Sequence, residues 1–135
     1  MFSSKKNKTA SRAVSAKIDS LIGQNTEMSG NVSFSGGFHV DGKVKGNISS
    51  HEASSVLTLS DHGVIEGEVR VPNIILNGTV IGDVYASERV ELASNAKVVG
   101  NVYYNLIEMA MGAEVNGNLV HQTDKPEIGT VDEVD

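Results

Sequence analysis

Histidine and acidic side chains, which most often bind metal ions or transfer protons, are scattered through this chain of 135 residues. The four histidines show neither His-x-x-His nor His-Glu-x-x-His, the spacings with which neighbouring histidines hold zinc. They are His39, His51, His62 and His121. Glu66 and Glu68 flank Gly67 on one strand face and could act as an acid–base pair, but such outward carboxylates are more often simply solvated.

The sequence also lacks the usual motifs for nucleophiles and phosphate binding. No serine lies in a Gly-x-Ser-x-Gly elbow, and no glycine-rich loop opens a helix. The chain has no cysteine, so it can form neither a disulfide nor a thiolate metal site. The sequence therefore predicts no catalytic residue, no metal ligand and no cofactor.

A repeat, Gly-x-(Val/Ile/Leu), organises the sequence and occurs six times at intervals of 15 to 21 residues. A period near ~18 residues is too short for a helix-pair repeat or a propeller blade, and it is typical of one coil of a β-solenoid. The six copies are Gly30-Asn31-Val32, Gly46-Asn47-Ile48, Gly67-Glu68-Val69, Gly82-Asp83-Val84, Gly100-Asn101-Val102 and Gly117-Asn118-Leu119.

Further apolar positions surround each glycine. The residue two before it is apolar in all six copies, so strand alternation places the glycine and its two apolar neighbours on one inner face. Another apolar pair precedes this segment in five repeats, for example Phe38 with Val40 and Ile74 with Leu76. Three short strands per repeat, joined by turns such as Asp41-Gly42, predict a triangular prism with an apolar interior.

The number of repeats sets the size of the fold. Five coils span residues 38–121, and a less regular coil precedes them. The prediction is therefore an all-β protein, a parallel β-helix of about six coils. An ordinary antiparallel β-sandwich would explain the alternation, but not why the glycine keeps its place six times.

Charge divides the chain into three segments. Residues 1–25 carry five basic side chains and one acidic, residues 26–121 five basic and eleven acidic, and residues 122–135 one basic and five acidic. We expect a disordered basic arm (1–19), a β-helix domain (20–121) and a disordered acidic tail (122–135). An acidic domain argues against nucleic-acid binding. No apolar run is long enough to span a bilayer, which predicts a cytoplasmic protein.

The two ends of such a prism are the predicted contact surface between copies of the chain. Inner coils pair their backbone groups with the coils on both sides, whereas a terminal coil keeps one open edge. No amphipathic segment that could cap an end precedes the first coil or follows the last. The apolar side chains expected at the ends are Ile22, Met28, Val32, Phe34, Ile107, Met109, Val115 and Leu119.

The basic arm predicts a second contact, with an anionic membrane surface. It begins with an apolar tip and continues with a basic cluster, a combination that binds lipid weakly in one copy and strongly in many. The residues concerned are Met1, Phe2, Lys5, Lys6 and Lys8. A merely flexible, solubilising terminus is the alternative.

Outward positions of the later coils predict a possible lateral patch. Counting from the glycines places Ile81, Val99, Tyr85 and Tyr103 together on the outside. An exposed apolar and aromatic patch is a candidate contact surface. The alternative is that these residue types simply favour strands.

These features together resemble the bactofilins, small bacterial polymer-forming proteins. The resemblance covers residues 20–121 and rests on Leu21-Ile22-Gly23, on the stretch from Phe38 to Gly46, and on the later repeats, with Met1-Phe2 similar to the membrane-binding start of many members. It implies a right-handed β-helix that assembles end to end into non-polar filaments without nucleotide. Such filaments act as membrane-associated scaffolds that localise peptidoglycan synthases, hydrolases or other morphogenetic proteins.

Two other classes of protein stay open at this point. A left-handed β-helix enzyme of the acyltransferase type needs nearly strict six-residue units, which this chain breaks at residues 60–64 and 93–97. A β-solenoid adaptor that does not polymerise would share every feature of the repeat. Only the state of assembly distinguishes that adaptor from a filament subunit.

Overall fold

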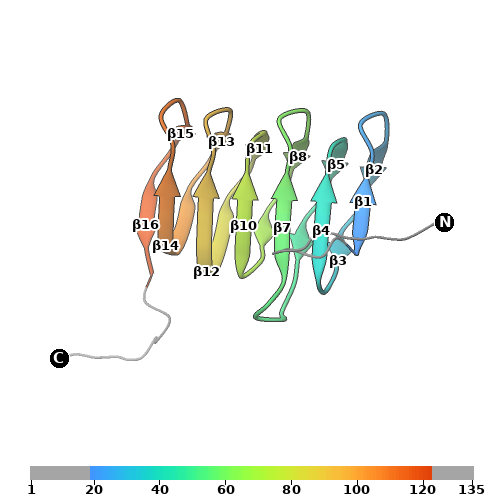
Figure 1. Ribbon diagram of the computed structural model, residues 1–135, viewed down its shortest axis with the longest axis horizontal. Helices are drawn as coiled ribbons and strands as arrows, with labels where there is room; N and C mark the ends of the chain where they lie inside the picture. Colours follow the sequence, from blue (N-terminus) through green and yellow to red (C-terminus); the bar gives the residue numbers. More distant parts are fainter. Residues whose placement is uncertain (1–18, 123–135) are drawn as a thin grey trace, which may run out of the picture.

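Alternating apolar residues and tight corners wind residues 19–122, the part of the chain described by the computed structural model, into a parallel β-solenoid. These residues form sixteen strands and no helix. The coils stack along the long axis of the molecule, with the first and last coils at opposite ends (Figure 1). The all-β parallel solenoid predicted from the repeat is confirmed.

One face of the solenoid is a six-stranded parallel sheet that takes one strand from each coil. Its strands are β2 (Glu27–Ser29), β5 (Lys43–Lys45), β8 (Val64–Glu66), β11 (Thr79–Ile81), β13 (Lys97–Val99) and β15 (Glu114–Asn116). Equivalent residues of successive coils lie side by side in this sheet, so that Ile65 pairs with Val44 on one side and Val80 on the other.

A ten-stranded sheet forms the other two faces. One of these faces contains β1 (Ser20–Ile22), β4 (Gly37–Val40), β7 (Val56–Leu59) and β10 (Asn73–Leu76). The other contains β3 (Val32–Ser33), β6 (Ile48–Ser49), β9 (Val69–Arg70) and β16 (Leu119–His121). Two long strands, β12 (Val84–Leu92) and β14 (Val102–Met109), belong to both faces.

These long strands differ from the expected three separate strands per coil. Between Ala86 and Arg89, β12 contains one more residue than its neighbours, which is a β-bulge. The carbonyl oxygen of Pro72 accepts hydrogen bonds from both Glu88 and Arg89, each at 2.9 Å, and so keeps the extra residue paired. The chain therefore turns this corner without leaving the sheet.

The core is a column of stacked aliphatic side chains inside the prism. The inward residues of the four inner coils are almost completely buried. The largest of them are Ile48, Leu57, Leu59, Ile65, Ile74, Leu76 and Leu92. One coil is longer than the others because residues 50–55 form a loop between β6 and β7, which projects from the prism (Figure 1). Inside that loop the Ser50 hydroxyl donates a 2.5 Å hydrogen bond to Ser55.

The repeated glycine lies at a corner, not within a strand as the alternation predicted. Gly82 follows β11, precedes β12 and has a φ of 146°. A Cβ atom at this position would lie 2.2 Å from the carbonyl oxygen of Gly67 in the preceding coil. Only glycine combines a positive φ with so close an approach of two backbones, which explains why it recurs in the sequence.

The polar residues after the glycines form a ladder that links successive coils at all but one step, from Glu68 to Asp83. Asn31 Oδ1 accepts the backbone N–H of Asn47 at 3.1 Å, and Asn47 Oδ1 accepts that of Glu68 at 2.9 Å. Further along, Asp83 accepts from Asn101 at 2.9 Å, and Asn101 accepts from Asn118 at 3.0 Å. The corner column is therefore held by side-chain hydrogen bonds as well as by backbone pairing.

Candidate polymer interface

Burial changes abruptly at the two ends of the solenoid. The apolar residue two after the glycine is fully buried in the four inner coils, where it is Ile48, Val69, Val84 or Val102. The equivalent residue is half-buried in the first coil, Val32, and 43% exposed in the last, Leu119. All six side chains are aliphatic. Their exposure therefore differs because a terminal coil has a neighbouring coil on one side only.

The apolar residue two before the glycine follows the same rule. It is fully buried in the inner coils, for example as Val44 and Val98, but Met28 in the first coil is 38% exposed and Val115 in the last is half-buried. Each end of the described solenoid therefore presents inward side chains that no further coil covers along the stacking axis.

Open backbone edges accompany these side chains. Among residues 19–122, β2 pairs only with β5 and β3 only with β6 at the first coil. At the last coil β15 pairs only with β13, and β16 only with β14. Unpaired N–H and C=O groups on an exposed strand edge are a template for pairing with another chain.

The interface residues predicted at the first coil differ in how exposed their side chains are. Phe34 is half-buried and packs on Phe38, with the ring centroids 5.2 Å apart. Ile22 is only 7% exposed, because it already belongs to the core. A joint at this end would consequently cover Met28, Val32 and Phe34 far more than Ile22.

The last coil is more apolar than its predicted residues suggest. Ile107 is half-buried and Met109 is 45% exposed, as expected for inward positions at an open end. Leu106 is also 62% exposed and Met111 94% exposed, and neither was predicted. The sequence could have indicated Met111, because it occupies a turn position at which an inner coil has the polar residue Asp61.

The predicted lateral patch is divided between two faces. Tyr85 and Tyr103 stack on the outside of β12 and β14, with ring centroids 4.5 Å apart and planes 4° apart. The Arg70 guanidinium lies 3.9 Å from the Tyr85 ring centroid and extends the stack. Desolvation raises the pKa of the Tyr85 hydroxyl, and the neighbouring Tyr103 adds to the shift.

The other pair of this patch, Ile81 and Val99, lies in register on the six-stranded sheet, 47% and 42% exposed. A corner of the prism, which includes Gly82 and Gly100, separates this pair from the tyrosines. The four residues thus form two strips on adjacent faces, of which the tyrosine strip is half-buried and the Ile81/Val99 strip is exposed.

Four of the titratable side chains named above, His39, His62, Glu66 and Glu68, are held in separate local pairs. Glu66 pairs with Lys43 at 3.2 Å and Glu68 with Arg70 at 3.0 Å, so the two carboxylates do not face one another. A hydrogen bond with Ser60 is the largest reason why the pKa of Asp41 lies below its usual value, and His39, 3.1 Å away, also lowers it.

The remaining observations concern metal ions, membranes and the arms. Residues 19–122 hold no group of three or more His, Cys, Asp or Glu side chains arranged to bind a metal ion. The same residues include no helix long and apolar enough to cross a membrane. The residues predicted to bind lipid, Met1, Phe2, Lys5, Lys6 and Lys8, lie outside the described part of the chain, as does the acidic tail from residue 123.

Proteins of known family have sequences similar to this chain. The sequence profile of the bactofilins, described as polymer-forming cytoskeletal proteins, matches residues 20–120. Bactofilin BacO of Myxococcus xanthus is 32% identical over 108 residues, which cover 80% of this chain and 83% of BacO. Bactofilin BacP of the same organism is 28% identical over 108 residues, which cover 79% of this chain and 44% of BacP. No solved structure matches the chain significantly. A family match over the whole solenoid, together with the two relatives, shows that this chain belongs to the bactofilin family of polymer-forming cytoskeletal proteins.

Proposed function

We propose that this protein is the subunit of a cytoskeletal scaffold and assembles end to end into filaments. The observation that carries the proposal is the exposure of inward side chains at both ends, next to open strand edges. An apolar side chain of this size contributes about 1.5–3 kcal/mol when it is fully covered. Several such side chains at each joint can offset the loss of translational and rotational freedom on association.

The filaments in this proposal are non-polar, so that like ends meet. An isologous contact needs only a patch that is complementary to itself, and each end offers a compact apolar section ringed by strand edges. The bactofilin resemblance is the reason for preferring this order to a head-to-tail order.

Assembly in this proposal needs neither nucleotide nor metal ion, and the role of the protein is structural rather than catalytic. The joint consists of apolar contacts and strand pairing, which require no bound phosphate. Filaments should therefore form in a buffer that contains a chelator and no ATP or GTP.

We further propose that the filaments lie at the inner face of the cell membrane and localise peptidoglycan synthases, hydrolases or other morphogenetic proteins. The basic N-terminal arm with its apolar tip supports the membrane contact. Many arms along one filament would bind together, which converts a weak single contact into a strong one.

The decisive experiment introduces a charge into one joint at a time. Leu119→Arg at the last coil and Val32→Arg at the first each place an unpaired charge at an inward terminal position, which costs several kcal/mol. Asn116→Arg is the matched control, because Asn116 is exposed on β15 of the same terminal coil and its side chain forms no hydrogen bond in the described structure. Asn101 is unsuitable as a control because its side chain holds the backbone of Asn118.

Negative-stain microscopy and light scattering report the result. The unmodified chain and Asn116→Arg should form filaments, whereas both end variants should keep their circular dichroism and form none. If like ends meet, each end variant should stop at a dimer joined through its intact end; a head-to-tail order would leave monomers.

Filaments of normal length from both end variants would contradict end-to-end assembly. The Tyr85/Tyr103 stack would then become the leading lateral contact. A monomeric unmodified chain would instead indicate an adaptor that does not polymerise.

A further inference from the structure

Sulfur is confined to the ends of the described solenoid. The chain has four methionines and no cysteine. Three of the methionines lie in residues 19–122, with Met28 in the first coil and Met109 and Met111 in the last. The buried apolar core between them consists of Val, Ile, Leu, Ala and Phe only. Any reagent that attacks thioethers would therefore reach the ends of the domain and leave its interior unchanged.

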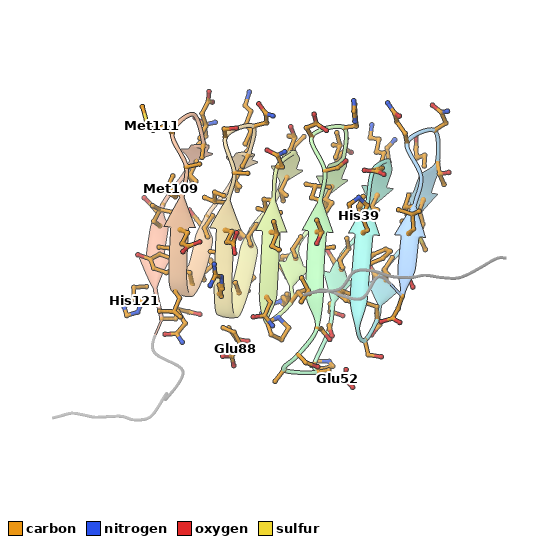
Figure 2. All side chains as sticks on the ribbon, in the orientation of Figure 1. His39, Glu52, Glu88, Met109, Met111 and His121 are labelled. Carbon is orange, nitrogen blue, oxygen red and sulfur yellow. The ribbon has the colours of Figure 1, made fainter. Side chains whose placement is uncertain are left out.

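Each of these methionines is accessible. Met109 pairs with Leu92 of the preceding coil on one side, and it is 45% exposed where Leu92 is 1% exposed. Met28 pairs with Val44 and is 38% exposed. Figure 2 shows Met109 and Met111 close together at one end of the stack, with Met111 on the outer turn.

Met111 has no local structural reason to be apolar. It is 94% exposed in the turn between β14 and β15. The equivalent turn position is polar in other coils, where it is Gln24, Asp61 or Ser94. A partner docked on the open end would cover an apolar side chain at its rim. The partner proposed above is a second copy of the chain.

The chemistry available to these thioethers is a two-electron oxidation. A peroxide transfers one oxygen atom to the methionine sulfur; its O–O bond breaks, the S=O bond forms, and the peroxide is reduced to water or an alcohol. The sulfoxide is polar, and thiol-dependent reductases reverse the reaction. Burying the new S=O group in a joint without a hydrogen-bond donor is unfavourable.

We propose that Met28, Met109 and Met111 form an oxidation site at which a peroxide blocks the end-to-end joint of the filament and leaves the coils folded. The proposal rests on the end-to-end assembly proposed above. Met28 and Met109 have the largest effects, because each is an inward residue whose sulfur would be covered by a joint, whereas Met111 lies at the rim. A filament joint closed before exposure protects Met28 and Met109, so oxidation acts mainly on free ends and stops growth.

The test uses the full chain and assigns the effect to particular sulfur atoms. The protein is oxidised with hydrogen peroxide in urea, freed of peroxide, and refolded by dilution beside an untreated sample. The control is a Met28→Leu, Met109→Leu, Met111→Leu variant treated identically, because Leu replaces Met with little change in volume and Met1 stays in both proteins. Met109→Leu alone serves as a second variant. Peptide mass spectrometry counts the sulfoxides, circular dichroism reports the fold, and sedimentation gives the critical concentration.

We expect oxidation to raise the critical concentration of the unmodified sequence on the order of tenfold or more, with unchanged circular dichroism. The triple variant should assemble equally well with and without peroxide. Oxidised Met109→Leu should form dimers through its last coil but few filaments, because oxidised Met28 still blocks the joint at the first coil. Methionine sulfoxide reductase should restore assembly of the oxidised protein. In finished filaments Met109 should oxidise more slowly than in Leu119→Arg, and Met28 more slowly than in Val32→Arg.

Three results would overturn this proposal. The first is normal assembly of a protein whose three sulfoxides are confirmed by mass. The second is loss of the β-sheet signal on oxidation, which would place the damage in the fold instead of the joint. The third is equal sensitivity of the triple variant, which would assign the effect to Met1. Failure of the untreated chain to form filaments would refute end-to-end assembly itself, and the untreated sample reveals this separately.

Discussion

At the scale of single residues, the corner glycines set how closely the coils can stack. Gly82 combines two demands, a φ of 146° and an approach that would bring a Cβ atom within 2.2 Å of a carbonyl oxygen. Gly30 in the first coil makes only the first demand, since its φ is 121° and a Cβ atom there would have no neighbour within 4 Å. The chain therefore offers a pair of positions that separate backbone strain from steric overlap.

We predict that Gly30→Ala lowers the free energy of unfolding by about 1–3 kcal/mol, the cost of holding alanine in a sparsely populated backbone region. Gly82→Ala should lose a further 1–3 kcal/mol or so, because the opposing atom is a backbone oxygen that cannot rotate away. Urea unfolding in a Val32→Arg, Leu119→Arg background, in which both joints are blocked, measures both losses without interference from assembly. Equal losses at the two positions would show that backbone strain alone selects glycine.

At the scale of elements, the ladder along the glycine corner has one interruption. The backbone N–H of Glu68 donates a hydrogen bond to Asn47 Oδ1, but the Glu68 side chain accepts none from the next coil, since its carboxylate turns to Arg70 at 3.0 Å. The backbone N–H of Asp83 in the next coil consequently has no side-chain acceptor among the hydrogen bonds of the described residues. A shorter side chain at position 68 would complete the column, as Asn47 does one coil earlier.

Glu68→Asn should therefore stabilise the solenoid by about 0.5–1.5 kcal/mol, the net contribution of one hydrogen bond. The ion pair with Arg70 that it removes is exposed and contributes little. Glu68→Gln is the matched control, because it removes the same charge and keeps the longer side chain. Thermal and urea unfolding of the two variants should differ by this amount, and a Gln variant as stable as the Asn variant would refute the ladder explanation.

At the scale of the whole molecule, the solenoid and the N-terminal arm are proposed to have different functions. The contacts proposed to join subunits lie at the ends of the prism, whereas the residues proposed to bind lipid lie in the arm at 1–8, outside the described solenoid. Two functions carried by separate segments should be separable by mutation. The membrane contact should also depend on polymerisation, because it gains its strength from many copies.

We predict that deletion of residues 1–8, or Phe2→Glu, abolishes co-sedimentation with anionic lipid vesicles and leaves filament formation unchanged. Leu119→Arg, which keeps the arm, should bind vesicles far more weakly than the filament and in a salt-dependent manner. Vesicles of neutral lipid provide the control. Undiminished vesicle binding by the deletion variant would place the membrane contact on the solenoid.

The sequence alone determined the coil and its core. In a solenoid the side chains of one coil meet the same positions of the next coil, so a periodic pattern read along the chain also describes contacts across it. The inward residues around Val44 and Val98 could be identified for this reason. Met28, Val115 and Leu119 could be identified in the same way as inward residues whose side chains a terminal coil leaves partly exposed.

Only the tertiary structure decided what happens at corners and edges. The apolar pattern is the same whether a glycine lies within a strand or turns a corner, because the backbone dihedrals of one residue leave the spacing of its apolar neighbours unchanged. The pattern also does not show whether β12 breaks or bulges beside Pro72, because no inward apolar residue marks the positions between Ala86 and Val90. Outward residues are unconstrained by the core, so the separation of Ile81 from Tyr85 could not be predicted. How far each side chain of a terminal coil is exposed, as when Ile22 is buried and Met28 is not, depends on the packing of the stacked coils and not on any single repeat.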